Sequence, residues 1–330
     1  MNALRVAIVG CGAVGTKRSR ALGTAELVAC VDTELSRAQQ LAATAHGCLA
    51  VARVTELDPR MAIDVAIVST THDALAETAT QMLQRGCHVL LEKPAARTLL
   101  ELAGVERDAR AAHRLVRVGF NHRYHPALAR AKQIVDAGEL GPLMFVRGRY
   151  GHGGRVGYDR EWRADPELSG GGALIDQGVH LIDLASWFLG DAFTKVDGFA
   201  DTFFWNMPVD DNAFLTLRTA NGKTAFLHVS ASEWKNLFSL EIYGRLGKLH
   251  VEGLGGSYGV ERLTWHRMFP EMGPPQSEVW EYPGPDTSWA VEFAEFTRDI
   301  AASRSPRPGL AEARVCLQTV AAIYDHRVVG

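Results

Sequence analysis

The pattern of hydrophobic and polar positions divides the chain into two halves. In the first half, short apolar runs of strand type alternate with amphipathic stretches of helix type. We expect strands at 4–9, 26–31, 65–69, 88–91 and 115–119, and helices at 16–22, 36–44, 74–85 and 99–113. Strands that alternate with crossover helices form a parallel sheet covered on both faces. The first half is therefore predicted to be a doubly wound α/β domain.

In the second half, strand-type runs follow one another with turn residues between them. We expect strands at 143–150, 195–204, 212–219, 224–232, 238–243 and 248–252, and helices at 126–137, 173–189, 289–303 and 310–327. Asn221-Gly222 stands between two of these runs, which is typical of a β-hairpin. The proline-rich stretch 270–285 is expected to be a surface loop. This half is predicted to be an α+β domain with a large, mostly antiparallel open sheet.

A length of 330 residues exceeds that of one ordinary domain. We expect one domain over 1–122 and a second over 123–330, with closing helices that can pack back on the first. The hydrophobic share of 47% and the charged share of 22% are those of a globular protein. A formal net charge of -3 argues against a general nucleic-acid binder, which usually carries a basic excess.

Other features of the sequence bear on the compartment. No run of 18 apolar residues is present, so we expect no membrane-spanning helix. The first residues lack the basic leader of a signal peptide and are expected to form a strand. The 5 cysteines are scattered and form no C-x-x-C pair, which argues against a zinc site and favours a reduced, cytoplasmic setting.

A glycine motif follows the first predicted strand directly. It has the pattern G-x-G-x-x-G and consists of Gly10, Gly12, Ala13, Val14 and Gly15, with a cysteine after the first glycine. Such glycines let the backbone turn tightly and approach a pyrophosphate at the start of a helix. A generic glycine turn is the alternative for a lone motif. The preceding strand and the following helix favour dinucleotide binding.

Asp32 ends the second predicted strand, at the distance from the glycine motif where an acidic residue binds a ribose 2′-hydroxyl. Its charge would repel a 2′-phosphate, so the sequence predicts NAD rather than NADP as the cofactor. Arg37 opposes this prediction, because a nearby arginine can accommodate that phosphate. Two roles stay open for Arg37: contact with the adenine end of the cofactor, and an exposed position on a helix.

A Glu92-Lys93-Pro94 step follows the apolar strand predicted at 88–91. Doubly wound sheets bind ligands at the carboxyl ends of their strands, which is where Lys93 lies. Its ammonium is suited to hold a substrate hydroxyl and to stabilise charge on oxygen as hydride leaves the carbon. Pro94 restricts Lys93 to extended backbone. Taken alone, the step is better explained as a surface lysine before a proline that starts a helix.

A third motif lies in the second half. Residues 170–183 begin with three glycines and place Asp176 and His180 four positions apart, on one face of the predicted helix. Together with the glycine motif and the Glu-Lys-Pro step, this segment resembles the glucose-fructose oxidoreductase / inositol dehydrogenase / MocA family. The resemblance spans essentially the whole chain. The second and third motifs are fairly specific together, while either alone is not.

The resemblance implies roles for three residues. Lys93 is similar to the family's catalytic lysine near the nicotinamide, and Asp176 to the aspartate that shares the substrate's hydrogen-bond network. His180 is similar to the general acid/base, work that suits a side chain whose unperturbed pKa lies near neutral pH. The plain alternative is a satisfied core histidine partnered by Asp176. No metal is implied, because the cofactor carries the hard chemistry.

The resemblance also implies contacts along the cofactor and the substrate. The residues expected along the cofactor are Ser69, Thr70, His72, Glu92, Lys93 and Asn121. For the segment around Thr70, ordinary helix capping is the alternative. Arg123 belongs to the segment that resembles the family's hinge between domains, and it is expected to face the substrate.

A loop before the predicted catalytic helix combines aromatic and basic side chains. The residues expected to bind substrate there are Tyr150, Arg155, Tyr158, Trp162 and Arg163. Aromatic faces suit a sugar ring or a base, and arginine forks suit phosphate. The mixture favours a nucleotide-linked sugar over a free polyol. A surface loop with Trp162 packed on the core is equally compatible.

These features predict an NAD-dependent oxidoreductase acting on a secondary hydroxyl or keto group of a sugar, with a UDP-hexose derivative oxidised at ring carbon three as the substrate. A free polyol or inositol dehydrogenase and a sugar-ketone reductase are alternatives. A non-catalytic NAD(P)- or sugar-sensing regulatory protein is an alternative of another class. The family implies a homodimer or homotetramer formed through the second domain's sheet. The exact sugar and the reaction direction stay open.

Overall fold

The structure is a computed structural model that describes residues 3–325. Contacts divide these residues into two compact units. The first unit consists of residues 3–120, 168–170 and 289–314. The second consists of residues 121–167, 171–288 and 315–325. The chain therefore passes between the units more than once, and each unit is built from segments far apart in the sequence.

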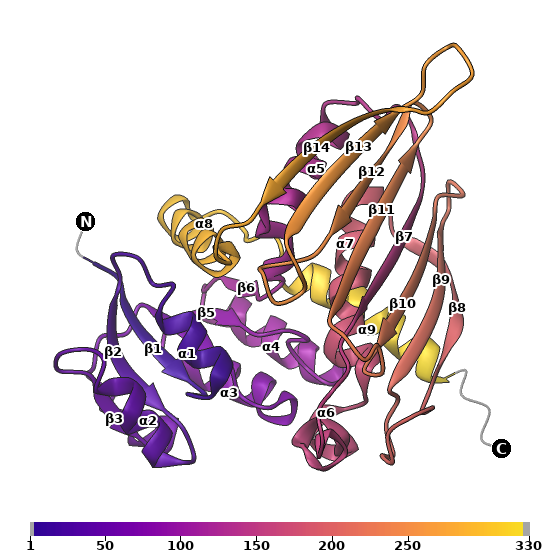
Figure 1. Cartoon of the computed structure of the whole chain (residues 1–330). Coiled ribbons are helices and arrows are strands. Elements are labelled where there is room, and N and C mark those ends of the chain that lie inside the picture. The colour runs from indigo at the N-terminus through magenta and orange to yellow at the C-terminus, as the bar shows by residue number, and fades with distance from the viewer. Residues whose placement is uncertain (1–2, 326–330) are drawn as a thin grey trace. The chain divides into compact units, whose positions relative to one another are not determined.

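The first unit contains a parallel sheet of 6 strands in the order β3-β2-β1-β4-β5-β6 (Figure 1). Its strands are β1 (Arg5–Val9), β2 (Glu26–Val31), β3 (Leu49–Val51), β4 (Val65–Val68), β5 (His88–Leu91) and β6 (Val116–Val118). The helices between them are α1 (Ala13–Ser19), α2 (Leu35–Ala42), α3 (His72–Gln84) and α4 (Leu99–Ala111). The strand order reverses beside β1, which is where doubly wound sheets bind their ligands. The predicted α/β class is confirmed.

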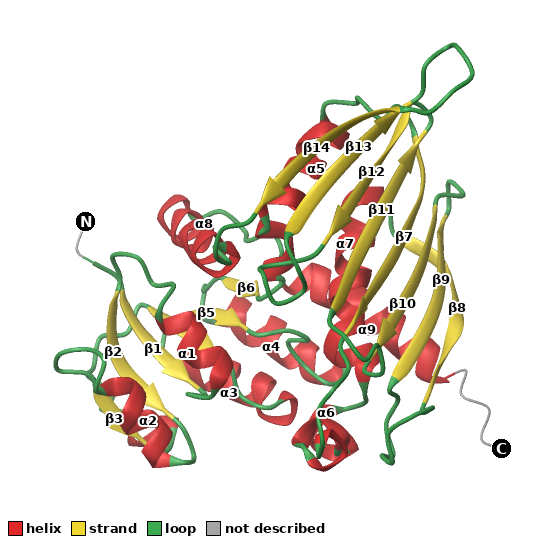
Figure 2. Ribbon diagram, in the orientation of Figure 1, coloured by secondary structure: helices red, strands yellow, loops and turns green. Residues whose placement is uncertain are grey.

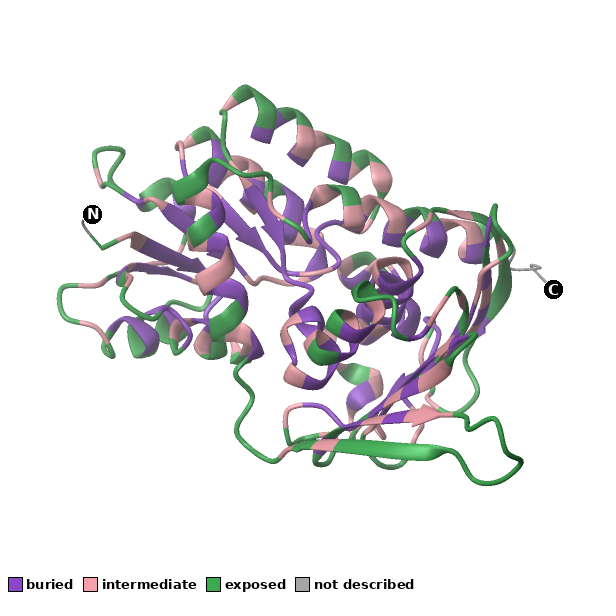
Figure 3. Ribbon diagram, turned by 90° about the horizontal axis from the view of Figure 1, so that it is seen from above, coloured by how far each residue is buried: buried purple, intermediate pink, exposed green. Residues whose placement is uncertain are grey.

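The core of the first unit lies on this sheet. Val6, Ile8, Ile67 and Leu90 have no exposed surface, and Figure 3 shows the strands of this sheet as largely buried. Apolar side chains on successive positions suit strands that are covered on both faces. Helix α8 (Ser288–Ala302) contributes Phe296 to the same core, although it lies near the end of the chain.

The second unit contains a sheet of 8 strands in the order β14-β13-β12-β11-β7-β10-β9-β8 (Figure 2). Every neighbouring pair is antiparallel except β7 and β10. The strands are β7 (Leu143–Gly151), β8 (Phe193–Asp201), β9 (Asn212–Thr219), β10 (Thr224–Ser230), β11 (Leu237–Gly244), β12 (Gly247–Glu252), β13 (Glu261–Arg267) and β14 (Gln276–Tyr282). The helices are α5 (Pro126–Asp136), α6 (Pro166–Ser169), α7 (Val179–Leu189) and α9 (Leu310–Asp325), of which α6 and α9 each contribute residues to both units. The predicted mostly antiparallel open sheet is confirmed.

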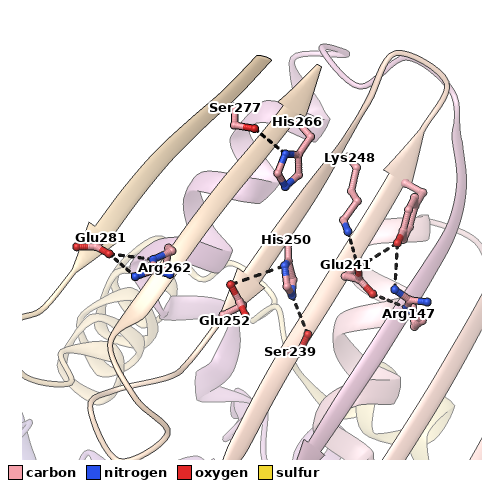
Figure 4. A network of polar contacts seen from close by, with 11 residues as sticks. Arg147, Ser239, Glu241, Lys248, His250, Glu252, Arg262, His266, Ser277 and Glu281 are labelled. Atoms are coloured by element: carbon pink, nitrogen blue, oxygen red, sulfur yellow. Dashed lines mark hydrogen bonds and ion pairs between the residues drawn. The ribbon is translucent and has the colours of Figure 1, made fainter. Parts of the chain in front are cut away.

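The two faces of this sheet differ in polarity. Helices α5 and α7 contact one face, where Val146, Leu240 and Ile242 are fully buried. The other face carries a network of polar contacts that runs across several strands (Figure 4). In that network, burial alone would raise the pKa of Glu241, but hydrogen bonds from neighbours including Arg147 lower it to about 2. This face therefore carries ion-paired side chains, while α5 and α7 pack on the opposite face.

Several strands and helices differ from the predictions, among them the short helix α6, which was not expected. Strands β3, β13 and β14 were not expected, and the prediction of a loop over 270–285 is wrong because it contains β14. That strand is mostly exposed, and only Trp280 and Tyr282 are half-buried, so its antiparallel pairing with β13 rather than an apolar run makes it a strand. The single helix expected at 173–189 is a π-helical turn over Leu174–Gly178 followed by α7.

A buried ion pair gives a test of the first unit's stability. Arg117 on β6 pairs with Asp299 on α8, and both side chains are 1% exposed. We expect Arg117→Met to lower the free energy of unfolding by about 3 kcal/mol, because it removes one partner of a buried pair. Arg262→Met, which breaks an exposed pair with Glu281, should cost less than about 1 kcal/mol. Urea unfolding midpoints measure both, and equal shifts would contradict the assignment.

Candidate functional site

The glycine motif forms a tight loop after β1. Its three glycines have different surroundings. Gly10 has a φ of +91°, and an added Cβ there would lie 2.5 Å from the backbone of Ser69. At Gly15 an added Cβ would lie 2.0 Å from the carbonyl oxygen of Gly10. At Gly12 it would meet nothing within 4 Å. The protein's own packing thus requires Gly10 and Gly15, while Gly12 leaves open space where a pyrophosphate could approach the backbone.

Asp32 is held against this loop by the backbone. One carboxylate oxygen accepts a hydrogen bond from the backbone N–H of Cys11 at 2.8 Å. The other accepts one from the backbone N–H of Glu34 at 2.9 Å. Arg37 instead forms an exposed ion pair with Glu34 at 2.7 Å, of a kind that contributes little to stability. The open face at Gly12 and the fixed carboxylate of Asp32 together fit the pyrophosphate and ribose of a dinucleotide.

Lys93 lies two residues after the end of β5 and is half-buried. The residue before it, Glu92, accepts hydrogen bonds from Arg18 at 2.8 and 2.5 Å. Arg18 also pairs with Glu292 at 2.5 Å. Burial by itself would lower the pKa of Arg18, but Glu292 and Glu92 raise it, so the guanidinium stays charged. Glu92 therefore anchors the end of the strand that carries Lys93.

Other side chains expected along the cofactor also have partners within their own unit. The hydroxyl of Ser69 donates to the carbonyl of Gly10 at 2.8 Å, which supports the glycine loop. His72 is buried, and its Nδ1 lies 2.9 Å from the carbonyl oxygen of Ser169. The hydroxyl of Thr70 donates to the next carbonyl at 3.1 Å. The amide of Asn121 donates to the Ser288 hydroxyl at 2.9 Å in the second unit.

In the second unit, Asp176 and His180 lie at the start of one long helix. Asp176 belongs to the π-helical turn and His180 to the first turn of α7, and they are 6% and 5% exposed. The Nε of Arg163 donates to a carboxylate oxygen of Asp176 at 3.0 Å. π-Helical turns occur frequently at functional sites, because they displace side chains from regular helical positions. The structure therefore brings a half-buried Arg163, from the turn at Trp162–Ala164, onto the buried carboxylate of Asp176.

His180 lies within a cluster of rings. Its ring stacks on His122, with centroids 3.8 Å apart and planes 20° apart. Tyr150 packs edge-on against His122 at 5.1 Å and against His180 at 6.1 Å. Burial and then Tyr258 raise the pKa of Tyr150 well above its usual value, so the phenol keeps its proton at neutral pH. Tyr150, which was expected at the substrate, therefore lies beside His180 in this cluster.

In the loop from 151 to 165, Tyr158 and Arg163 lie near Asp176, whereas Arg155 pairs with Glu161. Burial and then the charge of Asp176 raise the pKa of Tyr158. The guanidinium of Arg163 lies 4.5 Å from the ring of Trp162. Arg155 is 75% exposed and pairs with Glu161 at 2.7 Å.

Arg123, which was also expected at the substrate, is held within the core of the second unit. It makes a two-pronged ion pair with Asp183 at 2.7 and 2.8 Å, and both residues are buried. A guanidinium that matches a carboxylate in this way is strongly oriented. The contacts give Arg123 the position of a residue that joins the segment after β6 to α7.

Several residues of the site were not found from the sequence. Asp210 accepts hydrogen bonds from the backbone N–H groups of Gly172 at 3.0 Å and Leu174 at 2.8 Å, and so it shapes the start of the helix. An added Cβ at Gly172 would lie 1.8 Å from the carbonyl oxygen of Asp210, which explains a glycine there. Tyr258 and His122 join the ring cluster. No motif links these distant residues, so only the fold could show them.

Within residues 3–325, no group of three or more His, Cys, Asp or Glu side chains is arranged to hold a metal ion. Over the same residues, none of the helices combines the length and the apolar character needed to cross a membrane.

Comparison with known proteins identifies both units. Residues 4–120 match the model of an oxidoreductase family with an NAD-binding Rossmann fold, and residues 128–250 match the GFO/IDH/MocA C-terminal domain. Inositol 2-dehydrogenase 4 of Saccharopolyspora erythraea is 31% identical over 66% of this chain, and the match spans 64% of its own length. D-glucoside 3-dehydrogenase of Escherichia coli is 30% identical over 69% of this chain and 70% of its own.

Solved structures agree on the fold. Levoglucosan dehydrogenase in complex with NADH and levoglucosan superposes with a TM-score of 0.87 at 21% identity, over 98% of this chain and 97% of the other. Aldose-aldose oxidoreductase from Caulobacter crescentus superposes with a TM-score of 0.85 at 21% identity, over 98% and 97% of the two chains. The glycine loop, the Glu-Lys-Pro step and the Asp176–His180 helix thus stand in a chain that belongs to the GFO/IDH/MocA oxidoreductase family.

Proposed function

We propose that this protein is an NAD-dependent oxidoreductase that acts on a CH–OH carbon of a polyol or sugar. The observation that carries the proposal is the buried Asp176–His180 pair on the π-helical turn and α7, with Arg163 on Asp176. Family membership and the names of the relatives support it, since those relatives are inositol and glucoside dehydrogenases. A sensor would need no such acid/base pair.

Each residue has a defined task in this proposal. NAD, held by the glycine loop and Asp32, supplies the hydride acceptor when it is bound. His180 takes the proton of the substrate hydroxyl during oxidation and returns it during reduction. We assign this transfer to Nε2 because Nδ1 of His180 is buried. Asp176, oriented by Arg163, accepts a hydrogen bond from the substrate, and Lys93 stabilises negative charge on the reacting oxygen.

The contacts support a free polyol or sugar better than a nucleotide-linked sugar. The guanidinium of Arg163 is already engaged by Asp176, and that of Arg155 by Glu161. The neighbouring carboxylate partly neutralises each guanidinium and so weakens its attraction for a phosphate. A UDP-hexose remains the second candidate, supported by the aromatic rings beside these arginines and by the exposure of Arg155. The two candidates differ in whether Arg155→Ala weakens substrate binding.

Nicotinamide absorbance with a substrate panel tests the proposal. The panel contains inositols, methyl glucosides, levoglucosan, free aldoses and UDP-sugars, each offered with NAD. We expect growth of the NADH band with a polyol or sugar that carries no nucleotide. Turnover of UDP-sugars alone would favour the second candidate. NADH binding without turnover of any compound in either direction would contradict an enzyme and favour a sensor.

His180→Ala tests the assignment of the general acid/base. We expect turnover to fall by about 10²-fold to 10⁴-fold, the usual contribution of a positioned acid/base, while the Kd for NADH stays unchanged. His46→Ala, which removes an exposed histidine from the first unit, is the matched control and should keep full activity. Stopped-flow absorbance gives turnover, and NADH fluorescence gives the Kd. Unchanged turnover in His180→Ala would show that another group moves the proton.

The open space at Gly12 generates a separate prediction about the cofactor. Gly12→Ala adds a methyl group for which the protein has space. The free energy of unfolding should therefore stay within about 0.5 kcal/mol of the original. The Kd for NADH should rise at least tenfold, because that methyl group occupies the space of the pyrophosphate. Gly104→Ala, which also has open space around the new Cβ but lies on α4, should leave the Kd unchanged. Equal affinities in the two variants would place the pyrophosphate elsewhere.

We further propose that copies of the chain assemble through the uncovered face of the large sheet. Phe226 is 51% exposed there, and the strand register places it directly beside Arg147. Phe145 stacks on Tyr243 on the same face, with ring centroids 4.2 Å apart. Exposed aromatic rings among polar residues are typical of association surfaces. Figure 4 shows the polar network on this face.

Phe226→Glu tests the assembly. We expect the charge to weaken association at least tenfold, because it places an unpaired carboxylate in a surface that must lose its water. Sedimentation velocity over a range of concentrations measures the change. Leu100→Glu, which alters an apolar residue with 84% exposure on α4, should sediment as the original protein does. If both variants keep the original assembly, the face is not the interface.

A further inference from the structure

Two cysteines in the first unit lie next to each other without a bond between them. The sulfur atoms of Cys30 and Cys48 are 3.8 Å apart. Cys30 lies on β2, and Cys48 comes directly before β3. The register pairs Cys30 with Ala50, two residues after Cys48, so both thiols leave the same face of the sheet. No disulfide joins Cys30 to Cys48 in this structure.

The surroundings give the two thiols different roles. Cys30 has no exposed surface, whereas Cys48 is half-buried and open to a small oxidant. The hydrogen bond from Cys30 lowers the pKa of the Cys48 thiol, which favours its thiolate. Thiolate character and exposure together decide which cysteine reacts first with an oxidant. Cys48 is therefore the thiol that reacts, and Cys30 is the thiol placed to resolve the product.

We propose that Cys30 and Cys48 are a redox modification site, which hydrogen peroxide converts to a disulfide and thiols convert back. The Cys48 thiolate attacks one peroxide oxygen, the O–O bond breaks, and hydroxide leaves with a sulfenic acid formed on Cys48. Cys30 then attacks the Cys48 sulfur, the S–O bond breaks, and a second hydroxide leaves. The proton of each thiol ends on the hydroxide released. Two thiols are oxidised, and one peroxide is reduced to two waters.

The pair is connected to the proposed dinucleotide site, and this part of the inference depends on the proposed function. The thiol of Cys11, a residue of the glycine loop, donates at 3.5 Å to the carbonyl of Val31, the residue after Cys30. The backbone N–H of Cys11 donates to the carboxylate of Asp32. The backbone N–H of Asp32 in turn donates to the carbonyl of Val51 on β3 at 3.2 Å. A disulfide has an S–S distance of about 2.05 Å, so oxidation draws the two sulfur atoms together beside the strands that position Asp32. We expect oxidation to weaken NADH binding.

Mass spectrometry of the intact, full-length chain tests the site without reference to activity. After treatment with hydrogen peroxide and alkylation of the remaining thiols, we expect a bond between the peptides of Cys30 and Cys48, which dithiothreitol removes. Cys48→Ser should abolish the bond. Cys87→Ser, which removes a buried cysteine hydrogen-bonded to the carbonyl of Ile63, should leave it unchanged. A Cys11–Cys30 bond, a bond between two chains, or stable sulfinic acid on Cys48 would overturn the assignment.

Fluorescence titration then tests the connection to the dinucleotide site. We expect the Kd for NADH of the oxidised protein to be at least threefold higher than that of the reduced protein, and to return on reduction. Oxidised Cys48→Ser should bind as the untreated protein does. A mapped Cys30–Cys48 bond with an unchanged Kd would overturn the connection but not the modification site. If neither form binds NADH, the proposed function fails, whereas the peptide map still decides on the disulfide.

Discussion

The buried guanidinium of Arg18 is the interaction on which the first unit depends. It joins helix α1, which follows the glycine loop, to Glu92 at the end of β5 and to Glu292 on α8. A buried charge is costly unless it is paired, and here two carboxylates and the ring of Trp289 at 4.4 Å surround it. The same contact therefore fixes the glycine loop, the strand end before Lys93, and a helix from the far end of the chain.

Asp210 has a comparable part in the second unit. Its carboxylate binds backbone N–H groups around the triple glycine, and the hydroxyl of Tyr324 on α9 donates to it at 2.8 Å. Buried carboxylates that accept several backbone hydrogen bonds hold loops in one conformation. The π-helical turn with Asp176 begins at this point. The π-helical turn that carries Asp176 thus depends on a residue 34 positions further along the chain.

Much of the fold could be predicted because the sequence pattern of each element matches its surroundings. Strands β1, β4 and β5 are apolar at successive positions, as buried parallel strands must be, and their bounds agree closely with the prediction. Strand β14 could not be predicted, because an exposed edge strand is held by backbone hydrogen bonds to its neighbour, here β13, and does not require an apolar pattern. The π-helical turn was missed for a similar reason, since Leu174–Gly178 reads as ordinary helix and Asp210 lies elsewhere in the sequence.

The sequence by itself determined the family, the two-part architecture and the position of the candidate residues along the chain, because glycine spacing and apolar periodicity are local properties. Only the tertiary structure decided which of these side chains are available. It placed Glu92 on Arg18 and Arg123 on Asp183, and it brought His122 and Tyr150 to His180. It also placed Cys30 beside Cys48 across two strands. Such pairings depend on distances between segments far apart in the chain, and no local pattern of residues records them.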